Sequence, residues 1–166
     1  DASQFHATLN NVVAGEENLV AATAAGAAYN DKNVAGANKV SYTGVALTGT
    51  GTGNYAVATT AEGAGTITKR ALTLGEVTAQ SKTYDGTTAA DASKFGAVLS
   101  NAIAGDDVKA TATGAAYNSK NVAAASTIGY TGVALSGADA GNYSLAATTA
   151  QGAGTITARE LTLGTV

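Results

Sequence analysis

Tyr42-Thr43-Gly44-Val45-Ala46-Leu47 recurs without change as Tyr130-Thr131-Gly132-Val133-Ala134-Leu135, 88 residues further along the chain. Ala-Ala-Tyr-Asn at residues 27–30 returns at residues 115–118 with the same offset. Similarity at a fixed period is the signature of repeated structural units. The chain is therefore expected to fold as tandem modules of one design.

The ends of the repeated stretches predict the module boundaries. Gly-Ala-Gly-Thr-Ile-Thr at residues 63–68 returns at residues 152–157, and Leu-Thr-Leu-Gly at residues 72–75 returns at residues 161–164. The predicted organisation is a first module at 1–69 that lacks its opening strands, a complete module at 70–158, and the first strand of a third at 159–166. In a fragment cut at these points, the tail of a neighbouring molecule would be able to supply the missing strands, so self-association is one expectation.

The aromatic residues repeat with the modules. Phe5 corresponds to Phe95, and six of the seven tyrosines form pairs, while Tyr84 has no mate. The pairs are Tyr29 with Tyr117, Tyr42 with Tyr130, and Tyr55 with Tyr143. A chain without Trp and with few large aliphatic residues is expected to use such rings to fill its core. The alternative is that exposed rings form stacking platforms for a glycan.

Composition argues against several classes of function. The net charge is -3 and Lys and Arg together number only 9, so a nucleic-acid-binding surface is not expected. The absence of cysteine excludes disulfides, thiolate metal sites and cysteine nucleophiles. No apolar run approaches the roughly 18 residues of a membrane-spanning helix, so membrane insertion is not expected either.

Short segments of alternating polarity predict β-strands. Val108, Ala110 and Ala112 alternate with polar residues, and turn signals such as Asp85-Gly86 recur about every ten residues. This pattern predicts a mainly β fold of tandem elongated modules, for which an Ig-like sandwich is the leading architecture.

One stretch of the second module has a different period. Ala92, Phe95, Leu99 and Ile103 are spaced three or four residues apart, as on one face of a helix. A short helix at this point would indicate a β-grasp module in place of the sandwich.

Repeated polar and small residues are expected to shape turns and to hold each module together. Asparagines fix turns, lysines protect strand edges, and a tyrosine hydroxyl can hold a loop across a sandwich. A Lys–Asn isopeptide cross-link is an alternative use of the Lys-Asn-Val and Gly-Asn-Tyr motifs. The predicted structural residues are Tyr29, Lys32, Asn33, Gly53, Asn54 and Tyr55 in the first module, and Tyr84, Asp85, Gly86, Tyr117, Lys120, Asn121, Gly141, Asn142 and Tyr143 in the second.

The sequence offers little for catalysis or metal binding. His6 is the only histidine, and glycine occupies the matching position of the second module, so a histidine-dependent active site is not expected. Asp106, Asp107 and Asp139 are weak candidates for calcium ligands, but they lack the spacing of known calcium loops and are expected to form turns. No cofactor and no enzymatic activity are predicted.

Lys-Thr-Tyr-Asp-Gly-Thr-Thr at residues 82–88 resembles the opening motif of the YDG-type repeat, which is related to the MBG repeats of bacterial adhesins. Further motifs follow in the same order at residues 104–108, 132–143 and 154–157. The resemblance covers the second module completely and, apart from the opening motif, the first module. In the first module Glu16-Glu17 stands where the second has an Asp pair.

The resemblance implies a large adhesin of the filamentous-haemagglutinin-like, two-partner-secretion type, secreted to the bacterial cell surface and associated with the outer membrane. Such repeats are implied to be structural stalk or spacer modules in adhesion, biofilm formation and virulence. Neighbouring repeats of the same chain are the implied partners. The alternative implied role is a module that binds a glycan or an exopolysaccharide.

Overall fold

The computed structural model describes residues 1–165, which divide into two compact units between Thr68 and Lys69. Apart from four 3-10 helices of three residues each, every regular element in this part of the chain is a β-strand. The mainly β fold class predicted from the sequence is confirmed. Within the same residues, no helix has the length and apolarity needed to cross a bilayer.

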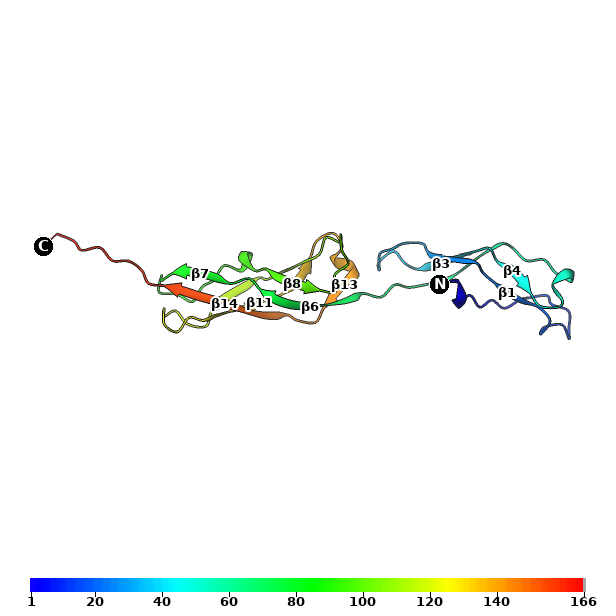
Figure 1. Cartoon of the computed structure of the whole chain (residues 1–166), viewed down its shortest axis with the longest axis horizontal. Helices are drawn as coiled ribbons and strands as arrows, with labels where there is room; N and C mark the ends of the chain where they lie inside the picture. Colours follow the sequence, from blue (N-terminus) through cyan, green and yellow to red (C-terminus); the bar gives the residue numbers. More distant parts are fainter. Residues whose placement is uncertain (166) are drawn as a thin grey trace. The chain divides into compact units, whose positions relative to one another are not determined.

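The second unit consists of three sheets (Figure 1). Their strand orders are β10-β11-β14-β7, β13-β6-β8 and β12-β9. The elements are β6 (Arg70–Val77), β7 (Gln80–Thr83), η3 (Ala92–Lys94), β8 (Ala97–Ser100), β9 (Lys109–Thr111), β10 (Gly114–Tyr117), β11 (Thr127–Thr131), β12 (Ala134–Ser136), η4 (Ala140–Asn142), β13 (Tyr143–Leu145) and β14 (Thr149–Thr157).

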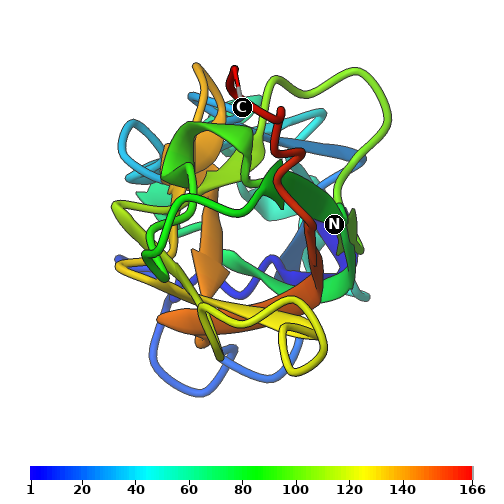
Figure 2. The same ribbon diagram turned by 90° about the vertical axis from the view of Figure 1, so that its left-hand side faces the viewer.

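The opening strands of the second unit pair with its closing strands. β6 runs parallel to β13, and β7 runs parallel to the end of β14. Parallel neighbours require a long connection, and here almost the whole module lies between the paired strands. In Figure 2 the second unit, coloured green to red, is seen end-on. The second unit is therefore closed by contacts between its first and last residues.

The first unit repeats the central part of this design. Its elements are η1 (Ala2–Gln4), β1 (Ala21–Thr23), β2 (Gly26–Tyr29), β3 (Lys39–Thr43), β4 (Ala46–Thr48), η2 (Thr52–Asn54) and β5 (Thr60–Ala64). β2 pairs with β3 from Gly26 opposite Thr43, and β10 pairs with β11 from Gly114 opposite Thr131, so the register is the same 88 residues later. Counterparts of β6 and β7 are absent from the described part of this unit.

The short helix that would indicate a β-grasp module is not formed. Only η3 is helical in this stretch, and the chain is extended again at Phe95 and enters β8. In β8, Leu99 packs against the core while Val98 is 61% exposed, which is the alternation of a strand. The helical spacing was misleading because pairing of β8 with β6 outweighs the weak helix preference around Gly96.

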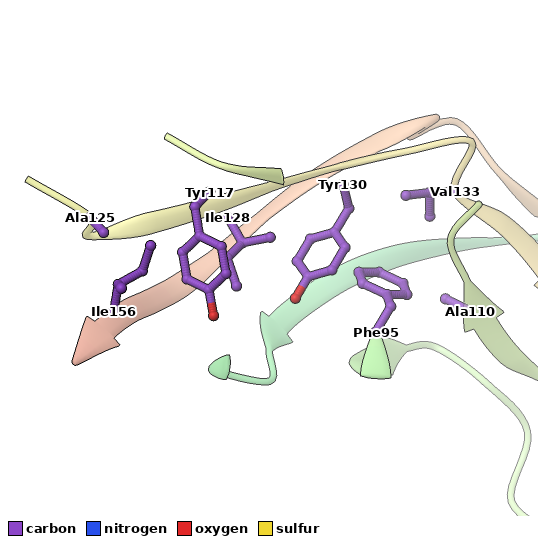
Figure 3. Close-up of a cluster of buried hydrophobic side chains, with 8 residues drawn as sticks. All are labelled: Phe95, Ala110, Tyr117, Ala125, Ile128, Tyr130, Val133 and Ile156. Carbon is purple, nitrogen blue, oxygen red and sulfur yellow. The ribbon is translucent and has the colours of Figure 1, made fainter. Parts of the chain in front are cut away.

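The core of the second unit is built on two tyrosines and one isoleucine. Tyr117 is 4% exposed, Ile128 0% and Tyr130 1%. Figure 3 shows the two tyrosine rings in one row with Ile128, and the Phe95 ring next to Tyr130. The rings of Phe95 and Tyr130 meet at a centroid distance of 4.8 Å and an interplanar angle of 55°, a tilted contact that aromatic pairs prefer.

Gly154 explains the repeated Gly-Ala-Gly motif. A Cβ atom at this position would lie 2.5 Å from Cγ1 of Ile128 and 3.0 Å from Cε1 of Tyr117. Gly65 has the same relation to Val40 and Tyr29 in the first unit. The glycine therefore leaves the space that the core side chains occupy.

Gly154→Ala is expected to destabilise the second unit by about 1–3 kcal/mol, because the added methyl overpacks the core. Gly129→Ala is the matched control, since Gly129 lies in the same sheet and a Cβ there would meet nothing within 4 Å. The control should be neutral or slightly stabilising. Urea unfolding followed by circular dichroism measures both changes, and equal stabilities of the two variants would contradict the packing explanation.

The predicted strand at 159–166 is not formed in the described residues. Residues 158–165 have no regular secondary structure, and Val166 lies outside the described part. The matching segment β6 is a strand because β8 and β13, which follow it in the chain, pair with it. Residues 158–165 have no such partner in the described structure.

Candidate functional site

The opening motif at residues 82–88 forms a compact polar site around Lys82. Its ammonium nitrogen donates hydrogen bonds to Asp85 Oδ1 (2.8 Å), to the Thr87 carbonyl (2.9 Å) and hydroxyl (3.1 Å), and to the Ala89 carbonyl (2.9 Å). The same nitrogen lies 5.4 Å from the centre of the Tyr117 ring. The Lys82 side chain is only 18% exposed. These contacts tie the loop after β7 to the core.

Asp85 gives the loop its shape. Its Oδ1 accepts hydrogen bonds from the Thr87 amide and hydroxyl, both at 2.9 Å, and Gly86 supplies the positive φ of 80° that the turn requires. The hydrogen bond from Lys82, followed by those from Thr87, lowers the pKa of Asp85 from 3.8 to about 2. The motif is thus assembled around an ionised carboxylate.

The lowered pKa of Asp85 predicts a loss of stability in acid. The folded state prefers the ionised carboxylate, so its contribution is present above pH 3.8 and is lost as the pH falls toward 2. Asp85→Asn is expected to unfold more easily at pH 7 and to show a flatter pH dependence between 5 and 2. Urea midpoints of both proteins across this range should converge near pH 2, and parallel curves would contradict the role of this carboxylate.

Tyr143 holds the loop before β9. Its hydroxyl donates to Asp106 Oδ2 at 2.5 Å and accepts the amide of Ile103 at 3.1 Å. The hydrogen bond to the carboxylate, with burial second, raises the pKa of Tyr143 above 10.0. Tyr143 as a whole residue is 3% exposed.

The first unit contains the same clamp with a longer acid. The Tyr55 hydroxyl donates to Glu16 Oε2 at 2.6 Å and accepts the amide of Val13 at 3.1 Å. The hydrogen bond to Glu16 raises the pKa of Tyr55 above 10.0. Replacement of the aspartate by glutamate therefore preserves the contact.

The three calcium candidates serve as acceptors within the protein. Asp106 accepts the tyrosine hydroxyl, Asp107 accepts the amide of Ala138 at 3.0 Å, and Asp139 accepts the amide of Asp107 at 2.8 Å. No three histidine or carboxylate side chains gather as metal ligands anywhere in residues 1–165. The arrangement is that of a loop clasp joining residues that lie more than 30 positions apart.

Two asparagines organise the loop between the hairpin strands, and neither is among the structural residues predicted from the sequence. Oδ1 of Asn118 accepts the amides of Ser126 and Thr127, while its Nδ2 donates to the Ala124 carbonyl. Asn30 makes the equivalent contacts with the amides of residues 38 and 39 and the carbonyl of residue 36. The signal was present, because each asparagine directly follows a repeated tyrosine.

The remaining repeated motifs lie in loops and 3-10 turns. Lys32 and Lys120 are exposed, each within a loop that follows a strand of the hairpin. The carbonyls of Asn33 and Asn121 accept amides three and four residues further on. Gly53, Asn54, Gly141 and Asn142 belong to η2 and η4.

The proposed lysine–asparagine cross-link is not supported in the second unit. Lys120 lies in the loop between β10 and β11, whereas Asn142 lies in η4. Figure 1 shows this loop and η4 at opposite ends of the unit. The two side chains are therefore not placed to form an isopeptide bond with each other.

Tyr84 is the one tyrosine without a mate and is half-buried. Its amide donates to the Thr157 carbonyl at 2.9 Å, and its ring lines an open, mainly apolar hollow of about 430 Å³ together with Val122 and Leu161. Only one surface tyrosine of the second unit is therefore available for contact with a ligand, and the residues that line its hollow include Arg159 but no acid.

Comparisons with known proteins agree with the repeated architecture. The family model described as YDG domain matches residues 1–62 and again residues 68–150. No curated protein and no solved structure matches the chain. The two matches cover most of the 166 residues and include the Lys82 site and both tyrosine clamps. The chain therefore belongs to the YDG domain family.

Proposed function

We propose that the chain is a structural spacer repeat of a bacterial cell-surface adhesin. The observation that carries the proposal is the burial of the repeated tyrosines in the second unit, where Tyr117, Tyr130 and Tyr143 are 4%, 1% and 3% exposed. Rings that stack on a sugar must reach the surface, whereas rings that hold a module together are buried. This pattern favours a spacer over a glycan-binding module.

The polar residues of the repeat support the same proposal. Lys82, Asp85, Asn118 and Tyr143 direct their hydrogen-bonding groups at loops of their own unit. A binding site usually keeps several polar groups directed at a shared cavity. A module whose polar groups form hydrogen bonds within their own unit is suited to transmit force and to fix the distance between the parts of the adhesin on either side of it.

The adhesin context is part of the proposal and rests on the resemblance of the repeat motifs. It includes secretion of the filamentous-haemagglutinin-like, two-partner type, placement at the outer membrane surface, and a role in adhesion and biofilm formation. A chain with no cysteine suits export in an unfolded state, because no disulfide closes it beforehand. Neighbouring repeats are the proposed partners, and no enzymatic activity is proposed.

A spacer exchange tests the proposed function. The YDG repeats of the parent adhesin are replaced by an equal number of unrelated β-sandwich modules, and adhesion of the bacteria is measured. A spacer role predicts that adhesion is retained with the foreign modules and falls when the repeats are deleted without replacement. Loss of adhesion after the exchange would contradict it.

A glycan array on this chain tests the alternative role directly. The spacer proposal predicts no retained sugar. Retention that disappears in Tyr84→Ala would instead support a glycan-binding module, because Tyr84 is the tyrosine of the second unit that lines a surface hollow. Retention by the unrelated spacer modules as well would identify non-specific binding.

A further inference from the structure

The opening and closing segments of the second unit lie side by side and run in the same direction. The opening segment, residues 70–83, contains β6 and β7, and the closing segment, residues 143–157, contains β13 and β14. Three residue pairs join β6 to β13, and four join β7 to the end of β14. Both ladders are parallel, and Figure 1 shows β7 beside the end of β14. The two segments are therefore paired near both of their ends.

This pairing determines how the second unit meets tension along the chain. Such tension enters the unit at Lys69 and leaves it at Ala158, on either side of the paired segments. It pulls the opening segment at its start and the closing segment at its end. Because the segments are parallel, one strand is drawn along the other, and the evenly spaced bonds of a parallel ladder are strained together. An antiparallel hairpin pulled at its open end instead loses its bonds one after another.

The rest of the second unit is shielded from the same tension. The strands and loops of residues 84–142 lie between the two segments in the sequence. Tension crosses directly from the opening segment to the closing segment through the two ladders. While the ladders hold, the core around Tyr117 and Tyr130 carries no load.

Further hydrogen bonds oppose sliding of β7 past its neighbours. The Gln80 side chain donates to the Tyr130 hydroxyl at 2.8 Å, which ties β7 to β11. The Tyr84 amide donates to the Thr157 carbonyl at 2.9 Å and so extends the ladder beyond the end of β7. The Thr157 hydroxyl donates to the Lys82 carbonyl at 3.4 Å. All of these contacts must break before β7 moves along β14.

The loop after β7 is fastened to the body of the unit as well. The Thr88 carbonyl accepts the amide of Tyr117 at 2.8 Å, and the Ala90 amide donates to the Ala115 carbonyl at 3.3 Å. Both acceptor and donor partners belong to β10. Because this loop is held, it does not follow β7 when tension pulls the strand toward its start.

We propose that the second unit is a load-bearing module, and that the β6–β13 and β7–β14 ladders carry the load in shear. The inference deepens the spacer proposal, on which it rests for the source of the tension. The resistance itself is a property of the chain and can be measured without the adhesin. It requires the unfolding force to depend on the points at which the chain is pulled, whereas the free energy of unfolding does not.

Single-molecule force spectroscopy of the whole chain tests the proposal. The chain has no cysteine of its own, so Lys69→Cys combined with Ala158→Cys places one handle at each exposed end of the second unit. Thr83→Cys combined with Ala158→Cys is the matched geometry, because both handles then lie at the same end of the β7–β14 ladder. The thiols of each pair are kept reduced until the handles are attached.

The two geometries are compared at one loading rate. We expect the unfolding force to be at least about twofold higher with handles at residues 69 and 158, because all four pairs of the β7–β14 ladder share the load. With handles at residues 83 and 158, the same pairs open in succession. Forced unfolding reports the rate of unfolding, so a difference between the geometries measures the barrier along each direction.

Two alanine variants test whether the contacts of β7 carry the load. Gln80→Ala removes the bond from β7 to Tyr130, whereas Asn118→Ala removes side-chain bonds to Ser126 and Thr127 within the shielded part. Both variants should unfold at lower urea concentrations than the original chain. With handles at residues 69 and 158, only Gln80→Ala should lower the unfolding force.

Equal unfolding forces in the two geometries would overturn the proposal, and so would an equal fall in force for the two alanine variants. The spacer exchange separates this failure from a failure of the proposed function. Retained adhesion after the exchange, together with equal forces, would leave the spacer role in place and reject the load-bearing ladders. Lost adhesion together with a higher force at residues 69 and 158 would contradict the spacer role alone.

Discussion

Tyr130→Ala is expected to destabilise the second unit by about 3–5 kcal/mol, the range for removal of a large buried ring. Tyr130 is 1% exposed and packs against Phe95 in a tilted contact, and the strands around it leave little freedom to close the cavity. Its hydroxyl also accepts a hydrogen bond from Gln80 Nε2 at 2.8 Å. The loss of unfolding free energy is measured by urea unfolding of the second unit, with hydrogen exchange of the β11 amides as the probe.

Two variants separate the causes of this effect. Tyr130→Phe keeps the ring and removes only the hydroxyl, so a loss of about 0.5–1.5 kcal/mol is expected. Tyr42→Ala removes the matching ring of the first unit, which is half-buried, and should cost clearly less than Tyr130→Ala. An equal cost at the two positions would mean that the first unit is as well covered as the second, contrary to the structure.

Lys82→Met is expected to lower the free energy of unfolding of the second unit by about 2–3 kcal/mol. Hydrogen bonds to a charged group contribute more than neutral ones, and the acceptors left without this largely buried donor lose a partner that water does not fully replace. Methionine retains most of the apolar stem beside Tyr117 but leaves the carbonyls of Thr87 and Ala89 and the carboxylate of Asp85 without their donor. The same variant should raise the pKa of Asp85 back toward 3.8, because the first cause of its lowering is gone.

Lys94→Met is the matched control for this prediction. Lys94 also lies three residues from an aspartate, Asp91, but the ion pair is 4.0 Å long and the Lys94 side chain is 66% exposed. Exposed ion pairs contribute little, so a change within about 0.5 kcal/mol is expected. Thermal unfolding gives the stabilities and carbon-detected NMR titration gives the pKa of Asp85. Similar losses for the two lysine variants would contradict the structural role of the Lys82 site.

Much of the fold could be predicted from the sequence, because repeated motifs and alternating polarity can be recognised without knowledge of tertiary contacts. The recurrence of Tyr42 as Tyr130 indicated modules of one design, and alternation around Ala110 indicated strands, which is the mainly β class observed. The helical spacing from Ala92 to Ile103 gave the wrong element, since one segment can match two periods when few apolar residues define it. Residues 97–100 form a strand because they pair with β6, and this long-range contact cannot be predicted from the sequence of the segment alone.

The polar sites were only partly predictable. The repeat identified Tyr143 and Asp106, but it did not predict that the Tyr143 hydroxyl would donate to Asp106 and accept the amide of Ile103. Glu16 stands in the first module where the second has Asp106, and the structure shows the same bond made by the longer side chain. Hydrogen bonds between residues about 40 positions apart depend on how the chain returns, which sequence spacing does not encode.

The sequence by itself determined the repeating unit, its β character and the residues that recur, because these follow from side-chain periodicity and from identity at a fixed offset. Only the tertiary structure decided that the tyrosines are buried and that β6 and β7 close the second unit by pairing with β13 and β14. The physical reason is that burial and strand pairing belong to the whole module. Tyr117 is covered in the second unit because Lys82 of β7 lies over its ring and the loop at Thr88 binds its amide, and the described part of the first unit has no counterpart of these residues over Tyr29.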